Sequence, residues 1–145
     1  MKLLIINGPN LNLLGVREKS VYGTKSYTDI CDFIKSEARN LKVEVEIIQS
    51  NIEGEIINFL HKAMGEYDGI IINPGAYTHY SYALHDAIKG ISIPTVEVHL
   101  SNIHAREEFR SKSVTAPACM GQISGFGYYG YIMAIMAHIN NDNKK

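Results

Sequence analysis

The 145-residue chain has no tryptophan, only two cysteines, four prolines and a net charge of −1. Cys31 and Cys119 do not form a C-x-x-C pair, so the cysteines provide no redox or zinc motif. Two unpaired cysteines are typical of a protein kept reduced, and we expect a cytoplasmic location. The small net charge excludes a general attraction to nucleic acid or to an anionic membrane, so neither is expected as a partner.

Long apolar runs and nucleotide motifs are also missing. No apolar run approaches the roughly 20 residues of a membrane span. The run from Leu3 to Ile6 is too short for the apolar core of a signal peptide and is followed by polar Asn7, so no such peptide is expected. Gly125-Phe126-Gly127 matches neither G-x-G-x-x-G nor a P-loop, which argues against a nucleotide site there.

What the chain contains is an alternation of short apolar runs and amphipathic stretches. The expected strands are Lys2–Asn7, Val43–Gln49, Gly69–Asn73, Thr95–His99 and Gly121–Ser124. Short strands alternating with helices are typical of a parallel sheet covered on both faces. We therefore expect a single α/β domain over residues 1–145, with a flavodoxin-like, doubly wound, five-stranded parallel sheet and helices on both faces.

Four helices are expected between and after these strands. The first two are predicted from apolar residues that recur at spacings of three or four, over about 30–41 and 52–64. Ser26-x-x-Asp29 and Ser50-x-x-Glu53 have the pattern of capping boxes at their starts. The third helix is predicted over about 81–89, with Gly90 as its C′ residue. The last is predicted over 128–139, followed by a frayed polar tail at 140–145.

Three loops at the carboxyl ends of the predicted strands carry unusual chemistry. The first reads N-G-P-N-L-N-L-L-G-V-R over 7–17 and continues to Tyr22-Gly23; the second reads N-P-G-A-Y-T-H over 73–79; the third reads E-V-H-L-S-N over 97–102, with Arg106 and Arg110 beyond. Ligands of doubly wound sheets bind outside these strand ends, so we expect the loops to converge. Asparagines, histidines and arginines with few free carboxylates fit a small, polar, anionic substrate.

Each feature also has an ordinary interpretation. A strand-end asparagine such as Asn73 is often a turn residue, and His79 and His99 are candidates for supporting or surface roles. Glu97 alternates with apolar neighbours, so it is a candidate buried partner of His99. Two histidines with no cysteine nearby make a poor metal site, and no metal is expected. The remaining histidines are predicted to be solvated, and three tyrosines are predicted to serve packing or an interface: His61, His85, His104 and His138; Tyr128, Tyr129 and Tyr131.

The motifs together resemble those of type II 3-dehydroquinate dehydratases. The resemblance rests on N-G-P-N-L-N-L-L-G at 7–15, R-E at 17–18, Y-G at 22–23, N-P-G-A-Y-T-H at 73–79, E-V-H-L-S-N at 97–102, A-R-E at 105–107, F-R at 109–110 and G-Q-I-x-G at 121–125. It covers nearly the whole chain in register. One departure is Lys19, which stands where the family usually has proline and removes a fixed φ from the loop that carries Arg17 and Tyr22.

The resemblance implies a flavodoxin-like enzyme that dehydrates 3-dehydroquinate to 3-dehydroshikimate without metal or cofactor, in the shikimate pathway. It implies a homo-oligomer, a dodecamer built from trimers. In the implied stepwise anti elimination through an enolate, Tyr22 is the base, His99 the acid, Arg17 the group that favours the phenolate, Asn10 the enolate donor and Glu97 the partner that orients His99.

For substrate binding, the resemblance places Asn73, His79 and Arg110 on hydroxyls and the Leu100 and Ser101 N–H groups on the carboxylate. It implies that Asp86 reaches a neighbouring subunit's site.

The rival interpretation is a catalytically inactive, flavodoxin-like small-molecule binding module. A flavin or phosphate protein of this fold predicts a Ser/Thr/Gly-rich first loop, whereas this loop contains Pro9 and several leucines.

Overall fold

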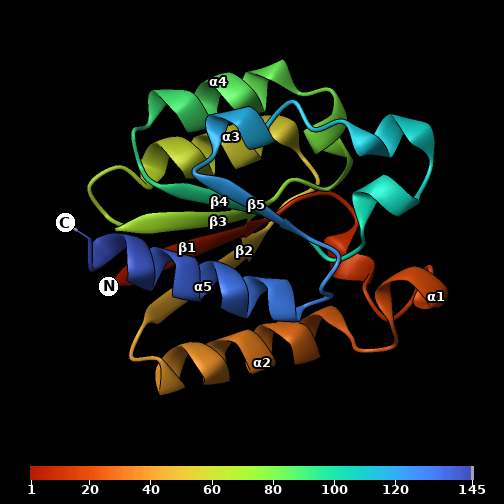
Figure 1. Cartoon of the computed structure of the whole chain (residues 1–145), viewed down its shortest axis with the longest axis horizontal. Coiled ribbons are helices and arrows are strands. Elements are labelled where there is room, and N and C mark those ends of the chain that lie inside the picture. The colour runs from red at the N-terminus through yellow and green to blue at the C-terminus, as the bar shows by residue number, and fades with distance from the viewer. Residues whose placement is uncertain (145) are drawn as a thin grey trace.

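The computed structural model describes residues 1–144, which form a parallel sheet between two layers of helices (Figure 1). The strands of this sheet are β1 (Lys2–Asn7), β2 (Glu44–Gln49), β3 (Gly69–Asn73), β4 (Thr95–His99) and β5 (Gly121–Ser124), in the order β2-β1-β3-β4-β5. The predicted flavodoxin-like sheet is therefore confirmed. β2 begins one residue later than predicted, because the Val43 N–H bonds to the carbonyl of Ala38 in the preceding helix at 2.9 Å.

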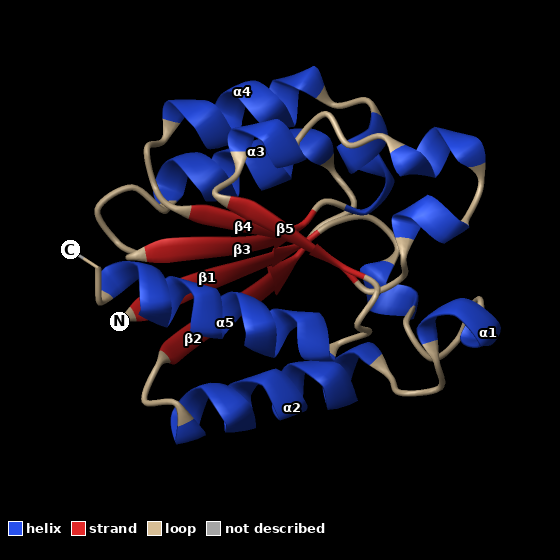
Figure 2. Cartoon of the chain, in the orientation of Figure 1, coloured by secondary structure: helices blue, strands red, loops and turns tan. Residues whose placement is uncertain are grey.

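Two helices cover each face of the sheet (Figure 2). α2 (Tyr27–Asn40) and α5 (Tyr129–Asp142) lie on one face, and α3 (Glu53–Lys62) and α4 (Tyr82–Gly90) lie on the other. The short helix α1 (Lys19–Tyr22) lies beyond the carboxyl ends of the strands. Short 3₁₀ turns complete that end and the way back to β5: η1 (Leu11–Leu13), η2 (Gly75–His79), η3 (Ile103–Ala105), η4 (Glu108–Ser111) and η5 (Ala116–Ala118). Within the described part of the chain, the helices are too short or too polar to cross a bilayer.

The core has two halves, separated by the sheet. Alternate residues of a strand point to opposite faces, so Leu3 and Ile5 pack with α2 and α5, whereas Leu4 and Ile6 pack with α3 and α4. All four side chains are at most 2% exposed, which explains the uninterrupted apolar run. Burying each such side chain contributes about 1.5–3 kcal/mol.

The two predicted capping boxes have different outcomes. The box at the start of α2 is confirmed: Asp29 N–H donates to Ser26 Oγ at 3.1 Å, and Ser26 N–H donates to Asp29 Oδ2 at 3.2 Å. The box at Ser50 is wrong. There, Ser50 Oγ accepts from the Ile52 N–H at 3.0 Å, just before the helix begins, and donates to Glu55 in its first turn rather than bonding to Glu53.

Three predictions near helix ends are also corrected. Gly90 is the last residue of α4 and does not have the positive φ of a C′ glycine. α5 continues to Asp142, and Asn143 N–H still bonds to the Ile139 carbonyl at 3.1 Å, so the predicted tail is largely helical; Lys145 lies outside the described residues. His138 is buried rather than solvated, and its Nε2 donates to the Ile70 carbonyl at 3.0 Å.

A backbone contact at Gly8 joins the first two loops of the site. Gly8 N–H donates to the Asn73 carbonyl at 2.8 Å, and a Cβ at Gly8 would lie 2.6 Å from the Pro74 carbonyl oxygen. No side chain fits at that distance without a shift of the backbone. The glycine therefore allows the loop after β1 to lie directly against the loop after β3.

We expect Gly8→Ala to lower the free energy of unfolding by about 1–3 kcal/mol, because the new methyl group overpacks a contact between two backbones. Gly54→Ala is the matched control: nothing lies within 4 Å of its added Cβ, and Gly54 lies in α3. Alanine there should stabilise the protein by about 0.5–1 kcal/mol. Urea unfolding followed by circular dichroism measures both; a Gly8→Ala protein as stable as the wild type contradicts the close approach.

Candidate active site

The loops at the carboxyl ends of β1, β3 and β4 surround one cavity of about 120 Å³. The predicted site residues that line it are Asn10, Arg17, Tyr22, Asn73, His79, His99, Leu100, Ser101 and Arg110. Two predicted residues do not line it. Glu97 lies behind His99, and Asp86 lies elsewhere on α4. Convergence of the three loops is what the doubly wound topology predicts.

Arg106 makes the closest polar contact with Tyr22. Its Nη1 donates to the Tyr22 hydroxyl oxygen at 2.7 Å and to Ser101 Oγ at 3.3 Å. The Tyr22 ring also lies near two guanidinium carbons, at 5.5 Å for Arg17 and 5.4 Å for Arg106. One donor on the oxygen and two positive charges beside the ring stabilise the negative charge that appears when the phenol loses its proton.

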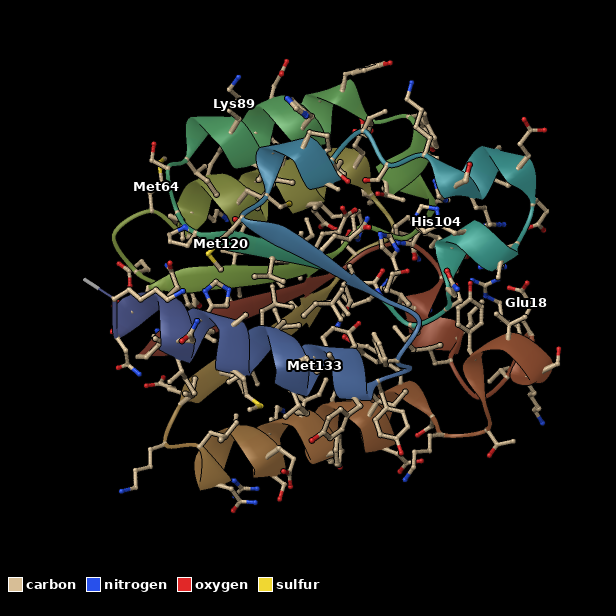
Figure 3. The ribbon with its side chains drawn as sticks, in the orientation of Figure 1. Glu18, Met64, Lys89, His104, Met120 and Met133 are labelled. Atoms are coloured by element: carbon tan, nitrogen blue, oxygen red, sulfur yellow. The ribbon has the colours of Figure 1, made fainter. Side chains whose placement is uncertain are left out.

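The different contacts of Arg17 and Arg106 are not apparent from the sequence. Arg17 was expected to act on Tyr22, yet its Nη1 forms an ion pair with Glu18. Glu18 also accepts from Arg106 Nη2 at 3.3 Å, and Figure 3 shows it beside α1. Sequence reasoning placed Arg106 among the groups expected to converge at the strand ends but gave it no role toward Tyr22, and it missed Glu18 as a site residue. The local signals were the R-E motif that contains Glu18 and the A-R-E motif that contains Arg106. Lys19 is the first residue of α1, a position that suits proline as well as lysine.

Glu97, on β4, is fully buried behind His99. Its Oε1 lies 3.1 Å from His99 Nε2. The other groups that donate to its two oxygens are Thr115 Oγ1 at 2.7 Å, Ser113 Oγ at 3.1 Å, Gln122 Nε2 at 3.2 Å and Thr78 Oγ1. A buried carboxylate with this many donors has its lone pairs satisfied.

The donors decide the charge of Glu97. Burial by itself raises the pKa of this carboxyl, but the hydrogen bond and charge of His99, with the bonds from Thr78 and Thr115, outweigh burial and hold the pKa below its ordinary value. Glu97 is therefore a carboxylate that only accepts, and the proton between the two residues belongs to His99 Nε2. Nδ1 is the remaining ring nitrogen of His99, which lines the cavity.

His79 enters the cavity from η2. Its Nδ1 lies 2.8 Å from the Lys112 carbonyl oxygen, which can only accept, so Nδ1 carries the proton. Burial lowers the pKa of His79 below its ordinary value, and the charge of Arg110 adds to this, although the bond to Lys112 opposes it. The ring is therefore neutral near pH 7 and has an acceptor at Nε2. Arg110 Nε pairs with Glu107 Oε2 at 2.7 Å.

The loop that carries Asn10 is held by the end of β2. Asn10 has a left-handed backbone (φ 67°), and its N–H donates to Asn51 Oδ1 at 3.0 Å. Gln49 Nε2 donates to the same oxygen at 3.0 Å and to the Gly8 carbonyl at 3.2 Å. Sequence reasoning did not identify Gln49 and Asn51, because nothing in their local pattern relates them to residue 10.

The turn after β4 is held through its carbonyl oxygens. Leu100 accepts from the Gly127 N–H at 2.9 Å, and Ser101 accepts from Ser124 Oγ at 3.0 Å. Both residues line the cavity. Asp86, in contrast, is exposed on α4 and borders a separate hollow with His61 and Met64. The structure of the single chain does not bring Asp86 to the cavity. Among residues 1–144, no group of three or more acidic, histidine or cysteine side chains has the geometry to hold a metal ion.

Comparison with known proteins identifies the family. The family model described as "Dehydroquinase class II" matches residues 1–139. This chain belongs to the class II dehydroquinase family. It is 68% identical over 146 residues to the 3-dehydroquinate dehydratase of Clostridium perfringens strain 13, with 100% of both chains covered. It is 68% identical over 137 residues to that of Clostridium acetobutylicum, covering 94% of this chain and 95% of the relative.

A solved structure of the class II dehydroquinase family confirms the fold. The type II dehydroquinase from Butyrivibrio crossotus superposes with a TM-score of 0.94 at 53% identity, over 96% of this chain and 97% of that one. At this level of similarity the whole sheet and its helices are shared.

We expect Glu97→Gln to destabilise the protein by about 3–5 kcal/mol near neutral pH, because it removes one charge from a buried pair. The folded-state pKa of Glu97 lies below its ordinary 4.5, so its stabilising contribution is present above that pH and is lost as the pH falls through the folded value. The stability gap between wild type and variant should therefore narrow at acid pH. Urea unfolding over a pH series measures it.

Glu108→Gln is the matched control, because the Glu108 side chain is exposed in η4. Its gap from the wild type should be within about 0.5 kcal/mol at every pH. A Glu97→Gln gap that stays constant with pH contradicts an ionised Glu97.

Proposed function

We propose that this chain catalyses the dehydration of 3-dehydroquinate to 3-dehydroshikimate, as a hydro-lyase of the shikimate pathway that uses no metal or cofactor. The observation that carries the proposal is the pairing of two groups across one cavity. Tyr22 has an arginine on its oxygen, and His99 has a buried carboxylate behind it. Elimination of water from a β-hydroxy ketone needs one base and one acid in such an arrangement.

The first step is removal of the proton beside the ketone. Arg106 and Arg17 stabilise the negative charge of the Tyr22 phenolate, and the phenolate then takes that proton. The electron pair of the broken C–H bond moves onto the ketone oxygen and forms an enolate. Asn10, which lines the cavity, supplies hydrogen-bond donors to that oxygen. Donors placed where charge develops contribute a few kcal/mol to such a step.

The second step is loss of the hydroxyl on the opposite face, an anti elimination. His99 donates the proton on Nδ1 to the leaving oxygen, the C–O bond breaks, and the enolate electrons form the new C=C bond with release of water. Glu97 keeps the Nε2 proton of His99 in place throughout and stabilises the doubly protonated ring. The proton on Tyr22 returns through solvent to His99 and resets both groups.

The charges of the cavity fit a carboxylate substrate. Arg17, Arg106 and Arg110 line it, against the single carboxylate of Glu18. Asn73, His79 and Arg110 are proposed to bind the substrate hydroxyls. The N–H groups of Leu100 and Ser101 are proposed to bind the carboxylate.

The active form is proposed to be a homo-oligomer, a dodecamer built from trimers, in the cytoplasm. An exposed Asp86 outside its own chain's cavity supports a role in a neighbouring subunit's site. Exposed aromatic and apolar side chains near it, Tyr82 at 67% and Met64 at 53%, support burial of this face against another copy.

Tyr22→Phe should lower kcat by about 10²–10⁴-fold, because it removes the base and leaves the fold intact. The assay follows the ultraviolet absorbance of the conjugated enone carboxylate after 3-dehydroquinate is added to chelator-treated protein. Tyr129→Phe is the control, because this tyrosine is 53% exposed on α5. Undiminished activity in Tyr22→Phe removes it as the base. A folded wild type that binds 3-dehydroquinate without an absorbance change favours the inactive binding module.

Mixing two inactive variants tests the role of Asp86. If Asp86 completes a neighbour's site, Asp86→Ala and Tyr22→Phe subunits assembled together form some sites with both groups intact, and activity returns on mixing. If Asp86 acts within its own chain, every mixed site lacks one group and activity stays absent. Subunits are exchanged in mild denaturant, and each variant alone, treated in the same way, is the control.

A further inference from the structure

A chain of hydrogen bonds, buried as far as Asn7, runs under the cavity from Asn73 to α2. Asn7 and Asn73 are the last residues of β1 and β3 and are paired in register. Tyr131, from α5, bonds to both: Asn73 Nδ2 lies 3.2 Å and Asn7 Oδ1 lies 2.6 Å from its hydroxyl oxygen. Asn7 Nδ2 then lies 3.3 Å from the Tyr27 hydroxyl. Asn7 and Tyr131 are each 1% exposed, and neither lines the cavity.

The direction of every bond in this chain follows from one backbone group. The Gly75 N–H, 3.2 Å from the Asn73 side chain, can only donate, so the atom facing it is Oδ1. The other end of the amide, Nδ2, must then donate to Tyr131. Burial raises the pKa of Tyr131 well above that of a free phenol, although the bond from Asn73 opposes this, so the hydroxyl keeps its proton. The hydroxyl uses that proton to donate a hydrogen bond to Asn7 Oδ1.

As a result, the side-chain amide of Asn73 is held in one of its two orientations. Rotation of the amide by 180° would place two donors, Asn73 Nδ2 and the Gly75 N–H, against each other, and would place Asn73 Oδ1 against a hydroxyl whose proton is already used. Of the two N–H groups on Nδ2, one is used by Tyr131, and the side chain lines the cavity. Asn73 therefore offers its second N–H to a bound molecule as a donor.

The donor at Asn73 matters because His79 offers an acceptor to the same cavity. Its Nδ1–H is used by the Lys112 carbonyl, which leaves Nε2 as an acceptor in the neutral ring. A hydroxyl group both accepts and donates, so it satisfies an Asn73 donor and a His79 acceptor together. A carbonyl or ether oxygen satisfies only the first.

We propose that Tyr131 is a positioning residue that acts through Asn73, holding its amide so that the cavity presents a donor to a substrate hydroxyl. The inference rests on the proposed function, since 3-dehydroquinate supplies the hydroxyl. Tyr131 contacts no substrate; its hydroxyl orients the amide that does.

The test is Tyr131→Phe, which removes one buried oxygen and keeps the ring. The expected result is a KM for 3-dehydroquinate raised about tenfold, with kcat within about twofold, because one oriented hydrogen bond to the substrate is lost. Tyr27→Phe is the matched control: it removes the hydroxyl at the far end of the same chain and leaves the Asn73–Tyr131 bond intact. Its KM should stay within about twofold of the wild type. Equal KM changes in the two variants overturn the proposal.

A double-mutant cycle separates positioning from general structural damage. In an Asn73→Ala background, Tyr131→Phe should leave KM unchanged, because the amide on which it acts is gone. A further tenfold rise there shows that Tyr131 acts by another route and overturns the proposal. A wild type with no dehydratase activity refutes the proposed function instead, so the two failures are distinguishable.

Asn7→Ala keeps the test open if Tyr131→Phe does not fold. The substitution removes Asn7 Oδ1, the acceptor of the hydrogen bond from the Tyr131 hydroxyl. The hydroxyl proton then turns toward Asn73 and opposes the Asn73 Nδ2 donor. KM should rise as in Tyr131→Phe, and an unchanged KM in the folded variant overturns the proposal.

Discussion

The ionised, buried carboxylate of Glu97 is the interaction on which the rest of the site depends. It lies on β4, yet it collects donors from η2, from the segment before η5 and from β5, through Thr78, Ser113, Thr115 and Gln122. Burying a charge costs several kcal/mol unless its lone pairs are satisfied, so each of these segments must come to the same point. η2 brings His79 with it, and the backbone before Ser113 supplies the carbonyl that holds the His79 ring. One carboxylate thus orients His99, the proposed acid, directly and His79, a proposed binding residue, indirectly.

Tyr22, the proposed base, is instead held by a positively charged side chain. Tyr22 lies on a short helix that a single chain holds in place mainly through Arg106, which reaches Tyr22, Ser101 and Glu18 at once. The two proposed catalytic groups are therefore held in different ways. His99, the proposed acid, is held by a cluster centred on the fully buried Glu97, whereas Tyr22, the proposed base, is held by a more exposed network of charges. A loop held by a few exposed contacts opens at low cost, as substrate entry requires.

The sequence was sufficient for the sheet and for the position of the site. Apolar runs such as Leu3–Ile6, bounded by polar or glycine residues, are typical of buried strands in a parallel sheet. The topology of that sheet then brings the strand ends together. Contacts made between distant segments were not predictable. His138 and Ser50 have ordinary local patterns, and their partners, the Ile70 carbonyl and Glu55, are set by packing. The same holds for Arg106, because only the path of the folded loop decides which arginine reaches Tyr22.

The most direct test of the ionised Glu97 is a neutron diffraction structure of the protein grown in deuterium oxide, which locates the exchanged protons. We expect a deuteron on His99 Nε2, pointing at Glu97 Oε1, with none on either Glu97 oxygen and with the Thr115 hydroxyl deuteron directed at the carboxylate. A deuteron on Glu97, with Nε2 of His99 bare, would mean that the buried carboxyl is neutral and that His99 is held in the opposite tautomer. That result would contradict both the proposed role of His99 as the acid and the ionised state of the carboxylate behind it.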